Sequence, residues 1–366
     1  MTRAAGRFVA IALVLGAIAA IAQTPAAGDR DVYQTIGRQL VLLDCHDVHC
    51  YRLLPAPLIE YLAGPSLVKW RAYAVLTNAA AAIAVGRLCL GLGLSARAAG
   101  FATWIAAFGF GPMQSVFDPY TSDPVMYLLA PVMMADLMAN RLGRPTLVGS
   151  VGVISKEFAA APLWIYALFS AIRRQWDTAS KAALGALTAT LVWFALQTAL
   201  MTLYNYSYGN NPSVNLLSGA YLAVWFKALG WPRAIASLFM AFGPLFVLLP
   251  FGYVRADRRL RLLAVASLPA LAAFLYVQQP DRALWNFHFV VIPIAMLAFE
   301  SLSDELAWTF VIAFGIANLR LGESQPAVVS WLRGIMLVAS LTLAYVAASA
   351  TARRDRGRPL RAEARP

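Results

Sequence analysis

The sequence consists largely of long apolar runs that are separated by short polar segments. Besides the region 146–172, which is treated below, the runs cover about 8–22, 71–90, 98–114, 124–139, 181–203, 233–254, 262–278, 283–299, 306–321 and 329–350. A helix of ~20 apolar residues can cross a lipid bilayer, and helices satisfy their own backbone polar groups there. We therefore predict an all-α polytopic transmembrane helical bundle with about 12 spans, two of them from 146–172.

Composition supports a membrane protein and leaves no room for a large soluble domain. Of the 366 residues, 60% are hydrophobic and 13% are charged, whereas about a quarter of the residues in a soluble domain are charged. The net charge of +12 comes mainly from Lys and Arg clusters between apolar runs and at the C-terminus, as in segments that face the cytoplasm. The basic residues form no aromatic-interleaved stripe, so we expect no nucleic-acid partner.

The expected organisation is a single membrane domain, residues 1–352, followed by a basic cytoplasmic tail, residues 353–366. The segment 25–70 is the longest external loop of the first half. Its parts 32–43 and 55–67 mix apolar and polar residues as interfacial helices do. With the basic clusters inside, both termini are expected in the cytoplasm.

The region 146–172 is apolar except for Ser155-Lys156-Glu157 near its middle. As a single span it would place the basic clusters at 173–174 and 255–261 outside the cell, against the positive-inside rule. We therefore predict a hairpin with short arms, whose tip carries Lys156 and Glu157 near the external face. An ionisable pair at this depth indicates a functional site.

The unusual polar residues of the chain are expected together at the external face. They are Asp29, Asp31, Arg52, Asp118, Asp123, Lys156, Glu157, Asp281, Arg282 and His288. A carboxylate at the rim of an apolar cavity can act as a general base, while a pair one residue apart, such as Asp29 and Asp31, can instead hold a divalent cation, Mg²⁺ or Mn²⁺. Lys and Arg nearby supply the positive charge and hydrogen-bond donors that a phosphate needs.

Structural roles remain open for several of these residues. Asp31, Asp118 and Asp281 are equally typical of turns and helix caps. Lys156 can pair with its neighbouring carboxylate or extend its amine to the lipid headgroups. His288 begins an apolar run, where a lone His is as often a hydrogen-bonded packing residue as a proton carrier.

The segment Cys45-His46-Asp47-Val48-His49-Cys50 contains two of the three cysteines and two of the three histidines. A zinc site is one interpretation, but four ligands within six residues do not have the spacing of a familiar zinc motif. The segment is expected in an oxidising compartment, where disulfides persist. We therefore predict a Cys45–Cys50 disulfide that fixes the loop.

Four short motifs carry a resemblance to a known superfamily. Gly28-Asp29-Arg30-Asp31-Val32-Tyr33, Arg52-Leu53-Leu54-Pro55-Ala56-Pro57-Leu58, Ser155-Lys156-Glu157 and Trp285-Asn286-Phe287-His288 resemble segments of the GT-C integral membrane glycosyltransferases. The branch they most resemble is the bacterial one related to polyprenol-phosphate-mannose-dependent α-mannosyltransferases. Asp29 takes the family's aspartate position after the first span, and Tyr33 takes that of its tyrosine.

The resemblance implies a reaction and a set of roles. A sugar, mannose or another hexose or pentose, would move from a polyprenyl-phosphate donor to an acceptor hydroxyl on a glycolipid, glycan or protein, with inversion. The catalytic residues would be Asp29 and Asp31, and the donor phosphate would be held by Lys156, Arg282, His288 and Arg52. The residues expected to line the substrates are Tyr33, Glu157, Asp118, Asp123 and Trp285.

The expected location is the bacterial plasma membrane, with the active site on the extracytoplasmic face. The alternative function is a polytopic transporter or lipid flippase of the cell envelope. Carriers place ionisable residues near the middle of the bilayer and often show repeated halves. The charges here gather at one face and we find no internal repeat, which favours the enzyme.

Overall fold

The computed structural model describes residues 3–25, 29–207, 232, 235–269 and 280–356, and every regular element in these ranges is helical. The all-α prediction is therefore confirmed for this part of the chain. The longest helices are α1 (Arg3–Ile21), α4 (Ser66–Gly91), α10 (Trp176–Tyr204) and α17 (Ala327–Arg356). The shorter ones are α2 (Arg30–Gln39), η1 (Val48–Tyr51), α3 (Ala56–Glu60), α5 (Ala96–Phe108), α6 (Phe110–Phe117), α7 (Asp123–Met138), α8 (Gly143–Gly152), η2 (Glu157–Ala160), α9 (Ala161–Ile172), α12 (Leu245–Arg255), α13 (Arg258–Ala266), α14 (Pro280–Trp285), α15 (His288–Phe299) and α16 (Asp304–Asn318).

Four helices in the described ranges are long and apolar enough to cross a membrane. They are Ala4–Ile21 within α1, α4, α10, and Ala327–Arg353 within α17. The number becomes five when Ile235–Phe242 and Leu245–Arg255, which meet at a bend of 84°, are taken as one broken span. The prediction of about 12 spans is not supported.

Breaks in the helices explain the difference. The apolar run 98–114 is divided at Gly109, whose extended backbone separates α5 from α6. The run 283–299 contains the end of α14 and then α15, which has only 12 residues. Such pieces are shorter than the ~20 residues that a single crossing needs. The predicted span 262–278 lies partly outside the described residues.

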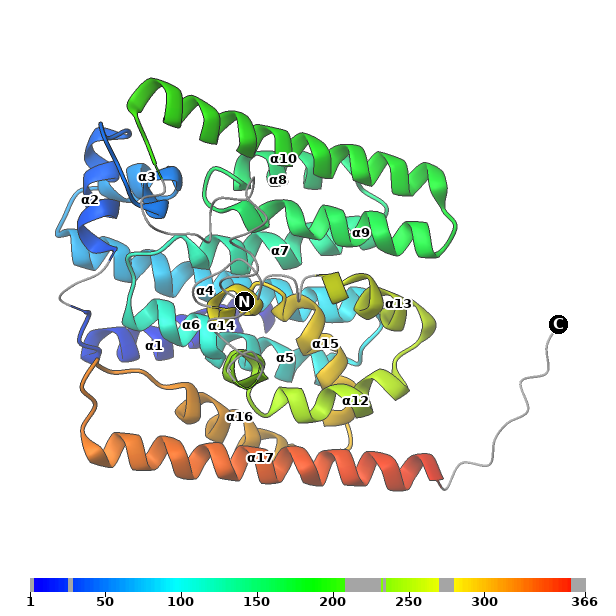
Figure 1. Ribbon diagram of the computed structural model, residues 1–366. Helices are drawn as coiled ribbons and strands as arrows, with labels where there is room; N and C mark the ends of the chain where they lie inside the picture. Colours follow the sequence, from blue (N-terminus) through cyan, green and yellow to red (C-terminus); the bar gives the residue numbers. More distant parts are fainter. Residues whose placement is uncertain (1–2, 26–28, 208–231, 233–234, 270–279, 357–366) are drawn as a thin grey trace.

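The helices form one bundle in which α4 contacts α1, α5 and α7. Figure 1 shows α10 along one edge of the bundle and α17 along the opposite edge. Small residues allow close approach between neighbours: a Cβ added to Gly86 of α4 would lie 2.2 Å from Oγ1 of Thr103 in α5. Contacts of this kind are common where helices pack inside membranes.

The chain turns back on itself between α8 and α9. Beside the turn, a Cβ on Gly152 would lie 2.9 Å from the Cβ of Ala159. From the middle of α9, the hydroxyl of Tyr166 donates a hydrogen bond of 2.6 Å to Oδ1 of Asn140, which precedes α8. The turn itself carries Lys156, so the structure agrees with the predicted hairpin.

The segment between α1 and α4 forms a small layer at one end of the bundle. It contains α2, η1 and α3, and a disulfide joins Cys45 to Cys50 as predicted. Tyr33 of α2 is fully buried and its ring lies 5.5 Å from the ring of Trp70 in α4. This packing fixes the start of α2, and with it Asp29, against the membrane helices.

Candidate active site

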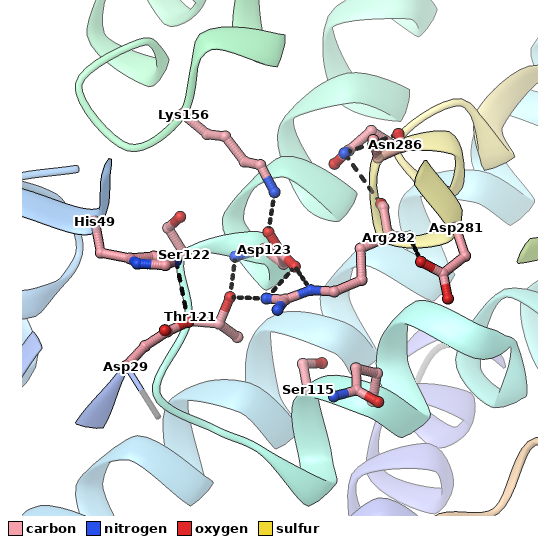
Figure 2. A network of polar contacts seen from close by, with 12 residues as sticks. Asp29, His49, Ser115, Thr121, Ser122, Asp123, Lys156, Asp281, Arg282 and Asn286 are labelled. Atoms are coloured by element: carbon pink, nitrogen blue, oxygen red, sulfur yellow. Dashed lines mark hydrogen bonds and ion pairs between the residues drawn. The ribbon is translucent and has the colours of Figure 1, made fainter. Parts of the chain in front are cut away.

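A buried carboxylate, Asp123, is the centre of the polar cluster. It is the first residue of α7 and only 1% of its surface is exposed. Lys156 from the hairpin turn donates to its Oδ1, and Arg282 from α14 pairs with its Oδ2 at 2.9 Å. Figure 2 shows the two cations reaching Asp123 from different sides. Three segments that are far apart in the sequence therefore meet at one carboxylate.

The guanidinium of Arg282 is held in one orientation. Its Nε and Nη2 donate to Oδ2 of Asp123 at 3.1 and 2.9 Å, and Nη2 also donates to Oγ1 of Thr121 at 3.1 Å. The backbone N–H of Arg282 donates to Oδ1 of Asp281 at 3.0 Å. A planar guanidinium fixed in this way presents its donors in a set direction, which suits recognition of a phosphate.

The burial of this cluster is costly unless every charge has a partner. Lys156 is 6% exposed and the side chain of Arg282 is 17% exposed. Removing one member of a buried ion pair typically destabilises a protein by about 3–5 kcal/mol, because the remaining charge is left without compensation. Asp123 thus stabilises Lys156 and Arg282 at buried positions, where either cation would be unfavourable without a counter-charge.

A third cation lies beside the cluster. Arg52 forms an ion pair with Glu157 at 3.7 Å between Nη2 and Oε1, and its own Nε is buried without a hydrogen-bond partner. Tyr33 lies within electrostatic range of Arg52, and its hydroxyl donates to Oγ of Ser122 at 3.4 Å. Tyr33 and Arg52, both predicted site residues, therefore adjoin the segment that leads into Asp123.

Asp29 lies on the other side of Thr121 and Ser122 (Figure 2). It occupies the position before α2 where an aspartate normally caps the helix, yet its side chain makes no capping hydrogen bond. Its Oδ2 is instead 3.1 Å from Nε2 of His49. Asp29 is also within electrostatic range of Arg282. The charges of Asp29 and Arg282 are thus close enough to interact. The role of Asp29 as a proton acceptor stays a prediction.

A polar cavity of about 420 Å³ adjoins one side of the cluster. Its lining comprises Pro25, Phe110, Gln114, Phe117, Asp118, Asp281, Arg282, Arg320 and Glu323. Burial raises the pKa of Asp118 to about 6, with Arg282 opposing the shift and Asp29 and Asp123 adding to it. A carboxyl group with such a pKa changes its charge near neutral pH.

A second, larger cavity of about 1090 Å³ is lined mainly by apolar side chains of α9 and α10. We call it the apolar groove. One end is marked by Glu157, Phe158 and Phe287, and the other by Trp176 and Asp177. Glu157 pairs with Arg52, and Nζ of Lys156 lies 5.8 Å from the centre of the Phe158 ring. The groove therefore begins at the cations and extends along the hairpin.

Asp31 and His288 are two further residues that the sequence predicts as part of the site. Asp31 is exposed in the first turn of α2, where a carboxylate interacts favourably with the helix dipole. His288 is buried; its Nδ1 donates to the backbone oxygen of Trp285 at 2.8 Å, and the two rings stack 5.5 Å apart. This arrangement is that of a packing pair, the alternative left open for His288.

Three polar residues of this region were not singled out from the sequence. Thr121 and Ser122 connect Arg282 and Tyr33 to the start of α7, and His49 contacts Asp29. The run Thr121-Ser122-Asp123-Pro124 was a usable signal for the first two. The sequence indicates His49 only as a candidate zinc ligand or as part of a disulfide loop.

The described residues contain no group of three or more His, Cys, Asp or Glu side chains that could hold a metal ion. Asp31 is exposed, whereas Asp29 is partly buried. The Mg²⁺ or Mn²⁺ site stays a prediction.

No protein-family model matches this chain, and no curated protein matches it. Among solved structures, the chain is similar to the Archaeoglobus fulgidus oligosaccharyltransferase in its apo form, with 11% identity and a TM-score of 0.49. The match covers 94% of this chain and 56% of that one, so the chain spans little more than half the length of the solved protein.

Proposed function

We propose that this chain is a membrane glycosyltransferase of the GT-C type, which moves a sugar from a polyprenyl-phosphate donor to an acceptor hydroxyl. The observation that carries the proposal is a carboxylate, Asp29, within electrostatic range of Arg282, which lines a polar cavity. A further cation, Arg52, pairs with Glu157, which lines an apolar groove. A lipid-linked sugar requires such a combination, because its phosphate is charged and its tail is not.

The donor would bind with its phosphate at the cations and its tail in the apolar groove. Lys156 and Arg282 remain oriented by Asp123, and the buried Nε of Arg52 offers a further donor. Charge-assisted hydrogen bonds to phosphate are stronger than neutral ones. The groove, lined by Ala, Leu, Trp and Phe side chains, matches an isoprenoid chain in its chemistry.

The acceptor would enter through the polar cavity. Asp29 takes the proton of the attacking hydroxyl, whose oxygen forms a bond to the anomeric carbon as the bond to the phosphate oxygen breaks. The electron pair of that bond goes to the phosphate, where Lys156 and Arg282 stabilise the developing charge. A single displacement inverts the anomeric centre. The products are the glycosylated acceptor, on a glycolipid, glycan or protein, and the polyprenyl phosphate.

The test uses the purified full chain in lipid nanodiscs with polyprenyl-phosphate sugars and a panel of acceptors. Mass spectrometry should detect the inverted glycoside and an equal amount of polyprenyl phosphate. Asp29→Asn should abolish transfer while leaving the melting temperature unchanged, and addition of a chelator tests the predicted Mg²⁺ or Mn²⁺. Full activity in Asp29→Asn, or substrate flux through proteoliposomes without any bond formation, would contradict the proposal; the flux would indicate the transporter or flippase.

A further inference from the structure

The segment between the two cysteines of the disulfide contains a histidine that lies between two carboxylates. Nε2 of His49 is 3.1 Å from Oδ2 of Asp29, and its Nδ1 is 2.6 Å from Oδ1 of Asp47. The side chains of His49 and Asp29 are 17% and 21% exposed, whereas that of Asp47 is 45% exposed. The three residues form a chain of contacts from solvent to the proposed base.

The local structure fixes this histidine from several directions. Asp47 precedes η1, and its side chain also accepts a hydrogen bond of 2.8 Å from the backbone N–H of His49. Cys50, next in the sequence, is fully buried and bonded to Cys45. The ring of Tyr33 lies 5.7 Å from the imidazole. Because His49 is itself fixed in place, it can orient the side chain of Asp29, which it contacts.

The chemistry of the contacts assigns roles to the ring nitrogens. Both nitrogens of a protonated imidazole are hydrogen-bond donors, and both here face carboxylate oxygens. The hydrogen bond from His49 lowers the pKa of Asp47, which keeps that carboxyl ionised and able to accept. With Oδ2 of Asp29 engaged by Nε2, Oδ1 is the oxygen available to a substrate hydroxyl.

We propose that His49 is a positioning residue for the base: it fixes the carboxylate of Asp29 toward the acceptor and is itself fixed by Asp47 and the Cys45–Cys50 disulfide. The proposal rests on the proposed function, because it assumes that Asp29 accepts the proton of the hydroxyl. A displacement of about 1 Å from a reactive geometry can cost on the order of 100-fold in rate. His49 therefore acts on the rate of transfer rather than on donor binding.

Two isosteric variants separate positioning from general support of the loop. In His49→Gln the amide nitrogen takes the place of Nε2 and still donates to Asp29. In His49→Asn the shorter amide takes the place of Nδ1, which keeps Asp47 but loses Asp29. We expect His49→Asn and His49→Ala to lower kcat on the order of 100-fold with an unchanged KM for the donor, and His49→Gln to recover most of the rate.

The control is His46, which lies in the same loop but is exposed and contacts Oγ of Ser207 through Nδ1 at 2.6 Å. His46→Ala should retain the wild-type kcat. Equal losses in His49→Gln and His49→Asn, or a fall in melting temperature without a fall in kcat, would overturn the positioning role. A wild-type protein without transfer activity would instead overturn the proposed function.

A second measurement does not depend on activity. The chain has three histidines, so imidazole signals in a histidine-labelled sample can be assigned by single substitution. The ring nitrogens of His49 should shift in Asp29→Asn and in Asp47→Asn, while those of His46 stay in place. Unchanged His49 signals in Asp29→Asn would contradict the contact on which the inference depends.

Discussion

Arg282 donates two hydrogen bonds, of 2.9 and 3.1 Å, to one carboxylate oxygen of Asp123, which lies 159 positions earlier in the sequence. The same carboxylate accepts from Lys156 through its other oxygen. Because Asp123 is almost fully buried, the three charges depend on one another.

Asp123→Asn should destabilise the protein strongly. The substitution leaves Lys156 and Arg282 buried without a full counter-charge, which typically costs about 3–5 kcal/mol. The measurement is thermal unfolding in detergent. The matched control is Asp304→Asn, which removes the exposed ion pair with Arg97 and should cost at most about 1 kcal/mol. Equal melting temperatures for the two variants would show that the buried pairing contributes no stability.

Arg282→Lys should lower kcat for sugar transfer by about 10- to 100-fold, or about 1.4–2.7 kcal/mol of transition-state stabilisation. Lysine keeps the charge but cannot donate to Asp123, Thr121 and a phosphate from one planar group. Arg97→Lys is the control. It changes an arginine–aspartate pair that does not belong to the Asp123 cluster, and we expect wild-type kinetics. Retained kcat in Arg282→Lys would mean that charge alone is sufficient at this position.

Asp118 should make stability depend on pH in the direction opposite to most carboxylates. Its pKa in the folded protein is raised to about 6 from 3.8, so the folded state binds more protons than the unfolded state between these values. The contribution is complete below pH 3.8 and is lost as the pH rises through 6. The loss is up to about 3 kcal/mol before allowance for partial exposure.

Asp118→Asn tests this dependence. The variant should remove the decline in melting temperature that the wild-type protein shows between pH 5 and pH 7, because an amide does not ionise in that interval. Melting curves at several pH values in one detergent would provide the comparison. A decline of the same size in the variant would assign the effect to another group.

Ala183→Trp should obstruct the apolar groove. Ala183 of α10 lines it, whereas Leu184, the next residue, is 64% exposed and lies outside the lining. We expect the KM for a long-chain polyprenyl donor to rise about tenfold, which corresponds to 1.4 kcal/mol, with little effect on a donor that has a short tail. Leu184→Trp is the control. Identical KM values for both donors in Ala183→Trp would exclude the groove as the site of the tail.

Gly109→Ala should displace Trp285 and, with it, the helix that carries Arg282. The added Cβ would lie 1.9 Å from Cη2 of the indole, whose ring is fully buried. Overpacking of this kind costs about 1–3 kcal/mol. In Gly16→Ala the added Cβ meets nothing within 4 Å, and alanine favours a helix over glycine by up to about 1 kcal/mol. The two variants should therefore shift the melting temperature in opposite directions.

Sequence patterns predicted the parts of the site whose positions depend on neighbouring residues in the chain. Asp29 follows an apolar helix, Lys156 interrupts an apolar region, and Cys45 and Cys50 enclose a short loop; each position has a local reason. In the structure a disulfide joins Cys45 to Cys50, and Lys156, Arg282 and Asp29 lie in one region.

What sequence reasoning missed depends on contacts between distant segments. Asp123 is predicted only to line the substrates, whereas in the structure it lies at the centre of the cluster, because Lys156 and Arg282 reach it from distant segments. The span count failed because hydropathy does not register the break at Gly109 or the 84° bend near Gly243. Neither feature changes the average polarity of its segment.

The polar cavity and the apolar groove share no lining residue, which has a consequence for turnover. The spent lipid carrier would leave laterally along α9 and α10, while the enlarged acceptor would depart through the passage lined by Asp118 and Asp281. With separate exits, neither product blocks the departure of the other. Added polyprenyl phosphate should therefore compete with the donor for binding and leave the apparent affinity for the acceptor unaltered.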